Sequence, residues 1–105
     1  MINFIYISRI TMILFILSVA TTVNAGNVGQ GRAFYNDQCL RCHGSDGRGG
    51  QMPGTPNFSR GEGLRMSNVQ LKTRILAGRM ACPSFRGILS EKDVLDVVSY
   101  LRTLH

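Results

Sequence analysis

Several features common in globular proteins are missing from this 105-residue sequence. No stretch alternates apolar and polar residues as a half-buried β-strand does, and no internal repeat or low-complexity block is present. Helical spacing appears in three segments instead, so the sequence predicts an all-α fold. Acidic residues are also few, with six against twelve Lys and Arg. Because the basic residues are scattered rather than clustered, this charge gives no support for nucleic-acid binding.

A second absence is an apolar run long enough to cross a bilayer. Residues 10–23 are largely apolar, but they fall short of the roughly 20 residues of a spanning helix, and Thr and Ser interrupt them. Arg9 lies before this run and Val-Asn-Ala at 23–25 ends it, so residues 1–25 predict a secretory signal peptide cleaved after Ala25. An uncleaved anchor over residues 10–23 is the alternative.

Cleavage would leave residues 26–105 as one small domain in the periplasm or an equivalent extracytoplasmic compartment, with no stable membrane span. All six acids and eleven of the twelve basic residues lie in this part, so its formal charge is +5. A basic electron carrier would be steered toward an acidic partner, and the alternative is that the arginines only keep a small exported protein soluble. A domain of this size has a small hydrophobic core and usually needs additional stabilisation, for example by a bound cofactor.

The pattern Cys-x-x-Cys-His occurs at Cys39, Cys42 and His43. Two thiols at this spacing can add to the vinyl groups of one haem while the adjacent imidazole ligates the iron. A thioredoxin-type pair would follow a strand in a βαβ unit, and a zinc site would need two further ligands, for which only Cys82 and His105 remain. The sequence therefore predicts one covalently attached haem c, with His43 as its proximal iron ligand.

Three segments of the predicted domain are expected to be helices. The first covers residues 28–38 and leads into the Cys-x-x-Cys-His motif. Ser67 caps a second, which ends near Gly78, and Ser90 caps a third. Residues 44–63 hold seven glycines and two of the three prolines, which predicts a long loop. The apolar face of the third helix consists of Val94, Val97, Val98, Leu101 and Leu104.

Together these features resemble those of class I monohaem cytochromes c. The resemblance rests on Gly31 and Tyr35, spaced four residues apart ahead of the first motif cysteine, and on the helix Asp-Val-Val-Ser-Tyr-Leu-Arg at residues 96–102. It covers essentially all of the predicted domain. The resemblance implies a small fold in which three main helices surround one haem. It also implies that Gly31 and Tyr35 pack against Val97 and Tyr100 where the first and last helices cross.

The same resemblance implies roles for two further stretches. The carbonyl of a loop proline, Pro53 or else Pro56, would accept the second N–H of the proximal imidazole. The other axial ligand would come from a Met-Pro-x-Phe stretch ahead of the last helix, which here reads Cys-Pro-Ser-Phe at residues 82–85. Cys82 therefore stands in the place of the methionine, and we favour it. Met80 is the rival, although its ligation would require the loop to shift by two residues. An intermolecular disulfide and an inert, buried thiol also remain open for this cysteine.

The ligand pair determines the expected function. A thiolate lowers the potential of the iron, so His43 and Cys82 predict a low-potential electron-transfer protein. Loss of Cys82 on reduction would open a position for NO or CO, which is the first alternative. Ligation by Met80 would give a high-potential shuttle, the second alternative. No general acid or base is evident beside the iron, so no enzymatic activity is expected. His/Cys ligation is similar to that of NaxLS-type cytochromes, which implies a second small cytochrome subunit as partner in a heterodimer.

Overall fold

The computed structural model describes residues 26–50 and 52–105, together with residues 3, 4, 6, 7, 9, 10 and 12. The predicted cleavage site after Ala25, and most of the predicted signal peptide, lie outside the described residues. None of the helices in the described residues combines the length and the apolar character that crossing a bilayer requires.

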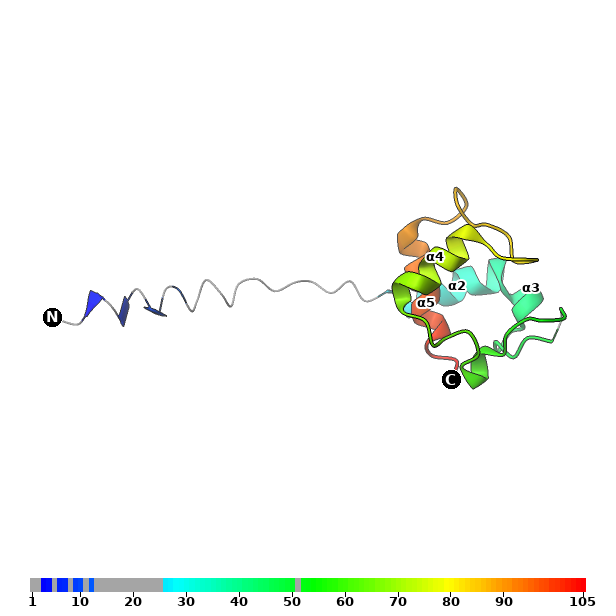
Figure 1. Cartoon of the computed structure of the whole chain (residues 1–105), viewed down its shortest axis with the longest axis horizontal. Helices are drawn as coiled ribbons and strands as arrows, with labels where there is room; N and C mark the ends of the chain where they lie inside the picture. Colours follow the sequence, from blue (N-terminus) through cyan, green and yellow to red (C-terminus); the bar gives the residue numbers. More distant parts are fainter. Residues whose placement is uncertain (1–2, 5, 8, 11, 13–25, 51) are drawn as a thin grey trace.

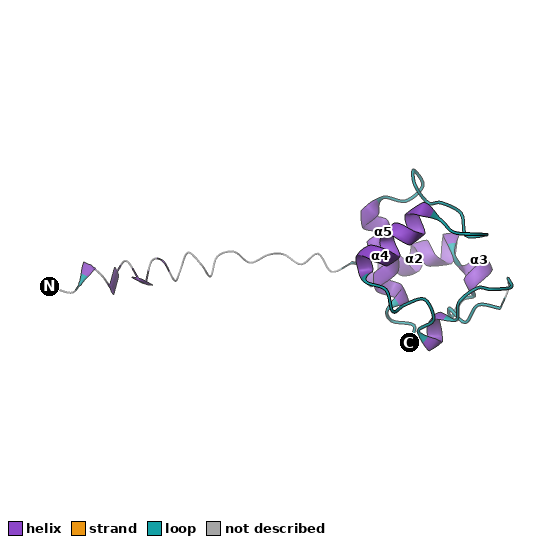
Figure 2. Ribbon diagram, in the orientation of Figure 1, coloured by secondary structure: helices purple, strands orange, loops and turns teal. Residues whose placement is uncertain are grey.

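Helices and loops make up the described part of the chain. Figure 2 shows the helices joined by loops, and no strand is assigned in residues 26–50 or 52–105. The predicted all-α fold is therefore confirmed. In chain order the elements are α2 (Val28–Gln38), α3 (Leu40–His43), the 3-10 helix η1 (Phe58–Arg60), α4 (Asn68–Ala77) and α5 (Glu91–Leu101).

Side-chain caps fix where the three longer helices begin. In each, the side chain of the capping residue accepts the backbone N–H three positions later, and the caps are Asn27, Ser67 and Ser90. Both serines are also part of full capping boxes, so each satisfies donors that would otherwise lack a partner. The predicted extent of the last apolar face was wrong at its end. Helix α5 ends at Leu101, and Leu104 lies in the following turn, where it is half-buried against the core.

Helices α2 and α5 are in contact at Gly31, which has no side chain to separate them. A Cβ atom on Gly31 would stand 2.9 Å from the backbone nitrogen of Val97 and would overlap the Asp96 carbonyl. One turn further along α2, the ring of Tyr35 meets that of Tyr100 edge to face, with 5.2 Å between centroids. The expected packing of these two helices is confirmed, and it holds together the first and last segments of the domain.

Backbone hydrogen bonds attach the glycine-rich loop to the end of α2 and to α3. The hydroxyl of the buried Tyr35 donates to the Gly44 carbonyl at 2.6 Å. The N–H of Gly49 donates to the His43 carbonyl at 2.9 Å, and that of Phe58 to the Gly47 carbonyl at 2.7 Å. These bonds fold the loop back beside α3, so His43 lies at the junction of the helix and the loop.

Candidate functional site

A cavity of about 520 Å³ lies between α3, the loop at residues 52–58, α4 and the loop at residues 79–83. In Figure 1 the yellow loop that follows α4 reaches back toward α3. The cavity volume is in the range of roughly 300–1,000 Å³ that is usual for cofactor sites. All the site residues proposed from the sequence line it, namely Cys39, Cys42, His43, Pro53, Pro56, Met80 and Cys82. The fold thus brings the motif and the distant cysteine to one site.

The Cys-x-x-Cys-His motif consists of α3, a single helical turn, and its N-cap Cys39. The N–H of His43 donates to the Cys39 carbonyl at 3.0 Å, so Cys39 and His43 lie at the two ends of one hydrogen-bonded turn. Cys39 and Cys42 are half-buried and free, as thiols that are to form two thioether bonds must be. The turn is continuous with α2, because the N–H of Cys39 donates to the Tyr35 carbonyl at 2.8 Å.

The imidazole of His43 is held flat against an aromatic ring. It stacks on Phe58 with 4.8 Å between ring centroids and 17° between planes. Burial lowers its pKa below the usual value, so the ring is held in the neutral form that can ligate iron. Its Nδ1 atom is buried without a hydrogen-bond partner among the described residues. Pro53 lines the same cavity, and its role as acceptor for the imidazole stays a prediction.

Cys82 and Met80 share one tight turn. Two backbone hydrogen bonds, of 2.9 and 3.0 Å, join Arg79 and Cys82 in both directions, and these two residues form the base of the turn. Met80 stands at the tip with a positive φ of 54° and a side chain that is 94% exposed. Both sulfur-bearing residues line the cavity, but only Cys82 is held by the paired backbone bonds.

The base of this turn is packed against the chain that leaves it. Gly78, with φ 74°, lies so close to the following segment that a Cβ atom would stand 2.6 Å from the Ser84 nitrogen. The Ser84 hydroxyl in turn donates to the Leu76 carbonyl at 2.6 Å. The side chain of Phe85 is buried beside them. These contacts fix the position of Cys82 relative to the end of α4.

The surroundings of the cavity disfavour ionisation of the thiols of Cys39 and Cys82. Burial, reinforced by the charges that Cys82 and Cys42 would carry, raises the pKa of the Cys39 thiol to about 12. Burial and then Cys42 raise the pKa of the Cys82 thiol, while the guanidinium of Arg74 acts in the opposite direction. An isolated thiolate is therefore disfavoured in this cavity. Thioether bonds at Cys39 and Cys42 would remove two of the three ionisable groups.

Phe58 was expected from the sequence to pack around the haem or in the core, but two specific contacts of the site were not predicted. The stacking of Phe58 on His43, and the approach of Arg74 from α4 to the cavity, depend on the path of the glycine-rich loop and on helix packing. Neither leaves a spacing pattern in the sequence. A short helix at residues 40–43 and the turn at residues 79–82 are also absent from the sequence-based expectations.

The residues present fit a covalently attached haem. Two free thiols, a neutral imidazole and two further sulfur-bearing residues, Met80 and Cys82, line one cavity of suitable volume, and the buried Nδ1 has no hydrogen-bond partner among the described residues. Comparison with known proteins agrees. Residues 26–101 match the family described as cytochrome c oxidase, cbb3-type, subunit III. No solved structure matches the chain.

Proposed function

Since the chain belongs to the cytochrome c oxidase, cbb3-type, subunit III family of c-type cytochromes, and so carries covalently attached haem c, we propose that it is an exported, low-potential electron-transfer protein. His43 and Cys82 are its axial ligands in this proposal. The observation that carries the proposal is that the motif and Cys82 line the same cavity, although they are far apart in the sequence.

Each motif residue has a separate task. Cys39 and Cys42 form the thioether bonds, and α3 presents both from one helical turn. His43 gives one imidazole nitrogen to the iron, while its stacking on Phe58 prevents the ring from rotating. When bound, the haem supplies reversible uptake of one electron. The protein supplies the ligands, an apolar surrounding and a fixed orientation, which together set the potential.

Cys82 is favoured over Met80 by sequence register and by backbone geometry. Cys82 directly precedes a proline and, three residues on, the buried Phe85, which is the order in which class I cytochromes present their ligand. Backbone bonds to Arg79 hold Cys82 at the base of its turn, whereas Met80 extends from the tip. An anionic thiolate stabilises ferric iron, so this ligand favours a low potential.

Export is supported by the contacts that residues 26 and 27 make immediately after the predicted cleavage site. The N–H of Asn27 donates to the carboxylate of Asp96 at 2.7 Å, and Gly26 packs closely on the Leu95 carbonyl. Asp96 is 1% exposed, so the chain is attached to α5 from the first residues after Ala25. Mass spectrometry of the protein recovered from the periplasm should give a chain that begins at Gly26.

The axial ligands can be tested by electron paramagnetic resonance of the oxidised holoprotein. Wild type should give a low-spin thiolate signal that Cys82→Ser abolishes and Met80→Leu preserves. Loss of the signal only in Met80→Leu, together with a thioether charge-transfer band in wild type, would overturn the proposal. It would instead make the protein a high-potential shuttle.

Gas binding is the second candidate function, and the exposure of Cys82 on a surface turn favours it. A thiolate that leaves on reduction would open a coordination position for NO or CO. Rapid CO uptake by the reduced wild type would support gas binding, while slow or absent uptake would support the electron carrier. Gel filtration with light scattering, alone and beside a second small cytochrome, tests the expected heterodimer.

A further inference from the structure

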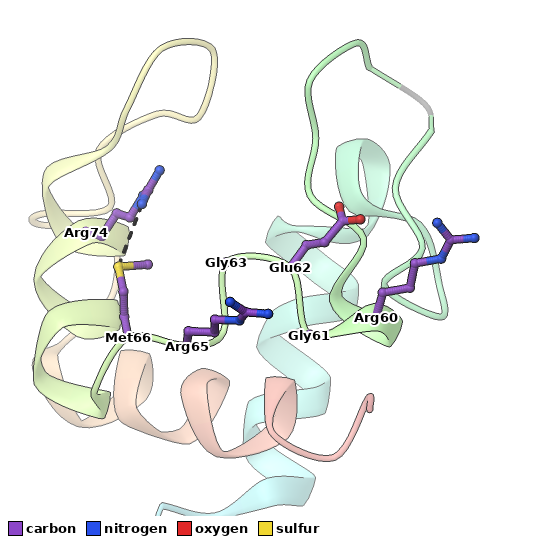
Figure 3. Close-up of a pocket in the computed structure, with 7 residues that line it drawn as sticks. All are labelled: Arg60, Gly61, Glu62, Gly63, Arg65, Met66 and Arg74. Carbon is purple, nitrogen blue, oxygen red and sulfur yellow. Dashed lines mark hydrogen bonds between the residues drawn. The ribbon is translucent and has the colours of Figure 1, made fainter.

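Three arginines surround a second hollow that borders the cavity of Cys82. The hollow has a volume of about 320 Å³, and we call it the arginine hollow after Arg60, Arg65 and Arg74. Figure 3 shows Arg60 extending from the end of η1, Arg65 from the loop that follows η1, and Arg74 from α4. Arg74 also lines the cavity itself, whereas Arg60 and Arg65 line the hollow alone. The hollow therefore lies beside the redox centre that is proposed above.

The positive charge of this hollow is not neutralised. Among the residues that the structure describes, none of the three guanidinium groups lies within 4.0 Å of a carboxylate oxygen. Nη1 of Arg74 donates only to the sulfur of Met66, at 3.7 Å, and a thioether is a weak acceptor. Glu62 is the one acid that lines the hollow, and its carboxylate accepts the backbone N–H of Asn57 at 2.8 Å.

Hydrogen bonds from the end of α5 hold the loop between η1 and α4, which carries Arg65. The guanidinium of Arg102, in the last turn of the chain, donates to the carbonyls of Leu64 and Met66, the latter at 2.5 Å. It also donates to the side chain of Asn68 at the start of α4, at 3.1 and 3.2 Å. The Leu64 side chain is buried, and this anchors the loop from the other side. Arg60 and Arg65 thus stand on a backbone that is already ordered, which lowers the cost of binding.

We propose that the arginine hollow is the docking site for the carboxylates of an acidic redox partner. Arginine forms paired hydrogen bonds with carboxylates, and three unpaired guanidinium groups fit two or more of them. The inference rests on the proposed electron-transfer function. Docking here places the partner next to the cavity edge at Gly63, Met66 and Arg74, which the hollow and the cavity share.

A carboxylate could also come from the cofactor itself, since haem carries two propionates. Only Arg74 lines both the cavity and the hollow, so it alone among the three is placed to serve the cofactor. Arg60 and Arg65 are exposed and lie away from the cavity lining. We therefore assign these two to the partner, and the two sources can be separated by experiment.

Small redox reagents of opposite charge test the local field. The reduced holoprotein gives one electron to hexacyanoferrate(III), an anion, or to hexaammineruthenium(III), a cation. At low ionic strength Arg60→Gln/Arg65→Gln should slow the first reaction about five-fold and speed the second, and high salt should remove both effects. The matched control is Arg32→Gln/Arg86→Gln, which removes the same charge from exposed residues that line neither space. Its effect should stay below about two-fold.

Binding is tested by nuclear magnetic resonance with a short peptide of alternating Glu and Gly. In wild type we expect the peptide to change the chemical shifts of residues 60–66 and of the Nε–H groups of Arg60 and Arg65. The changes at the backbone of residues 60–66 should be absent in Arg60→Gln/Arg65→Gln and present in the control Arg32→Gln/Arg86→Gln.

Equal effects of the two double variants on the electron-transfer rates, or chemical-shift changes spread over the whole surface, would overturn the docking site. A changed pH dependence of the potential in Arg60→Gln/Arg65→Gln, without peptide binding to wild type, would assign the arginines to the propionates. If wild type reduces neither reagent, the electron-transfer function itself fails.

Discussion

The backbone of Gly31 in α2 lies directly against the backbone of Asp96 in α5. A Cβ atom at Gly31 would overlap the Asp96 carbonyl, so the two helices approach as closely as their main chains allow. This contact sets the position of α2, and α2 leads through Cys39 into the Cys-x-x-Cys-His motif. The geometry of the site therefore depends on a residue that has no side chain.

Substitution of Gly31 by Ala tests this dependence. The added methyl group must push α5 away, and we expect the free energy of unfolding of the holoprotein to fall by about 1–3 kcal/mol. Guanidinium titration measures it. Gly29→Ala is the matched control, because a Cβ atom there meets only the Asn27 side chain, at 3.4 Å. Since alanine favours helices over glycine by up to about 1 kcal/mol, the control should be neutral or stabilising. Equal losses in both variants would show that the close contact is unimportant.

Tyr35→Phe tests how α2 is attached to the loop after α3. The variant keeps the aromatic packing on Tyr100 but leaves the buried Gly44 carbonyl without its donor. An unsatisfied buried carbonyl costs about 1–3 kcal/mol, and we expect a loss of stability in that range by the same titration. The visible spectrum should stay unchanged, because the iron ligands are not touched. An unchanged stability would mean that the carbonyl finds another partner.

The capping box of α5 predicts a pH dependence of stability. Hydrogen bonds from the Ser90 hydroxyl and then from its N–H lower the pKa of Asp93 below its unfolded value of 3.8. Between these two pKa values the unfolded state binds more protons, so stability is present above pH 3.8 and is lost as pH falls through the folded pKa. The holoprotein carrying Asp93→Asn should show a shallower decline in unfolding free energy below pH 3.8 than wild type. Parallel curves would contradict the capping role.

The parts of the structure that were predicted from the sequence are those that depend on local interactions. Caps such as Ser67 and Ser90 act on residues three positions away, so the pattern alone located both helices. The motif at Cys39 to His43 is also local. The stacking of Phe58 on His43 could not be predicted, because many loop paths are compatible with seven glycines.

Around the site, too, features set by local sequence were predicted and features set by contacts between distant residues were not. Leu104 continues the apolar spacing of α5, yet the helix ends three residues earlier, because apolar spacing does not by itself set a helix end. The hydrogen bond from the Arg102 guanidinium to the Leu64 carbonyl joins residues that are 38 positions apart in the sequence, and no local sequence pattern indicates it. The same guanidinium positions the loop that carries Arg65 beside the start of α4, the helix from which Arg74 extends, and no local pattern indicates that these arginines line one hollow.

The central claim is that Cys82 ligates the iron, and the midpoint potential of the holoprotein tests it most directly. Spectroelectrochemical titration should be made on wild type, Cys82→Met and Met80→Leu. Exchange of a thiolate for a thioether removes a negative charge from the iron, so Cys82→Met should raise the potential by hundreds of millivolts, within the roughly 0.8 V that axial ligands control. Met80→Leu should leave it unchanged. A large shift in Met80→Leu together with none in Cys82→Met would contradict the account.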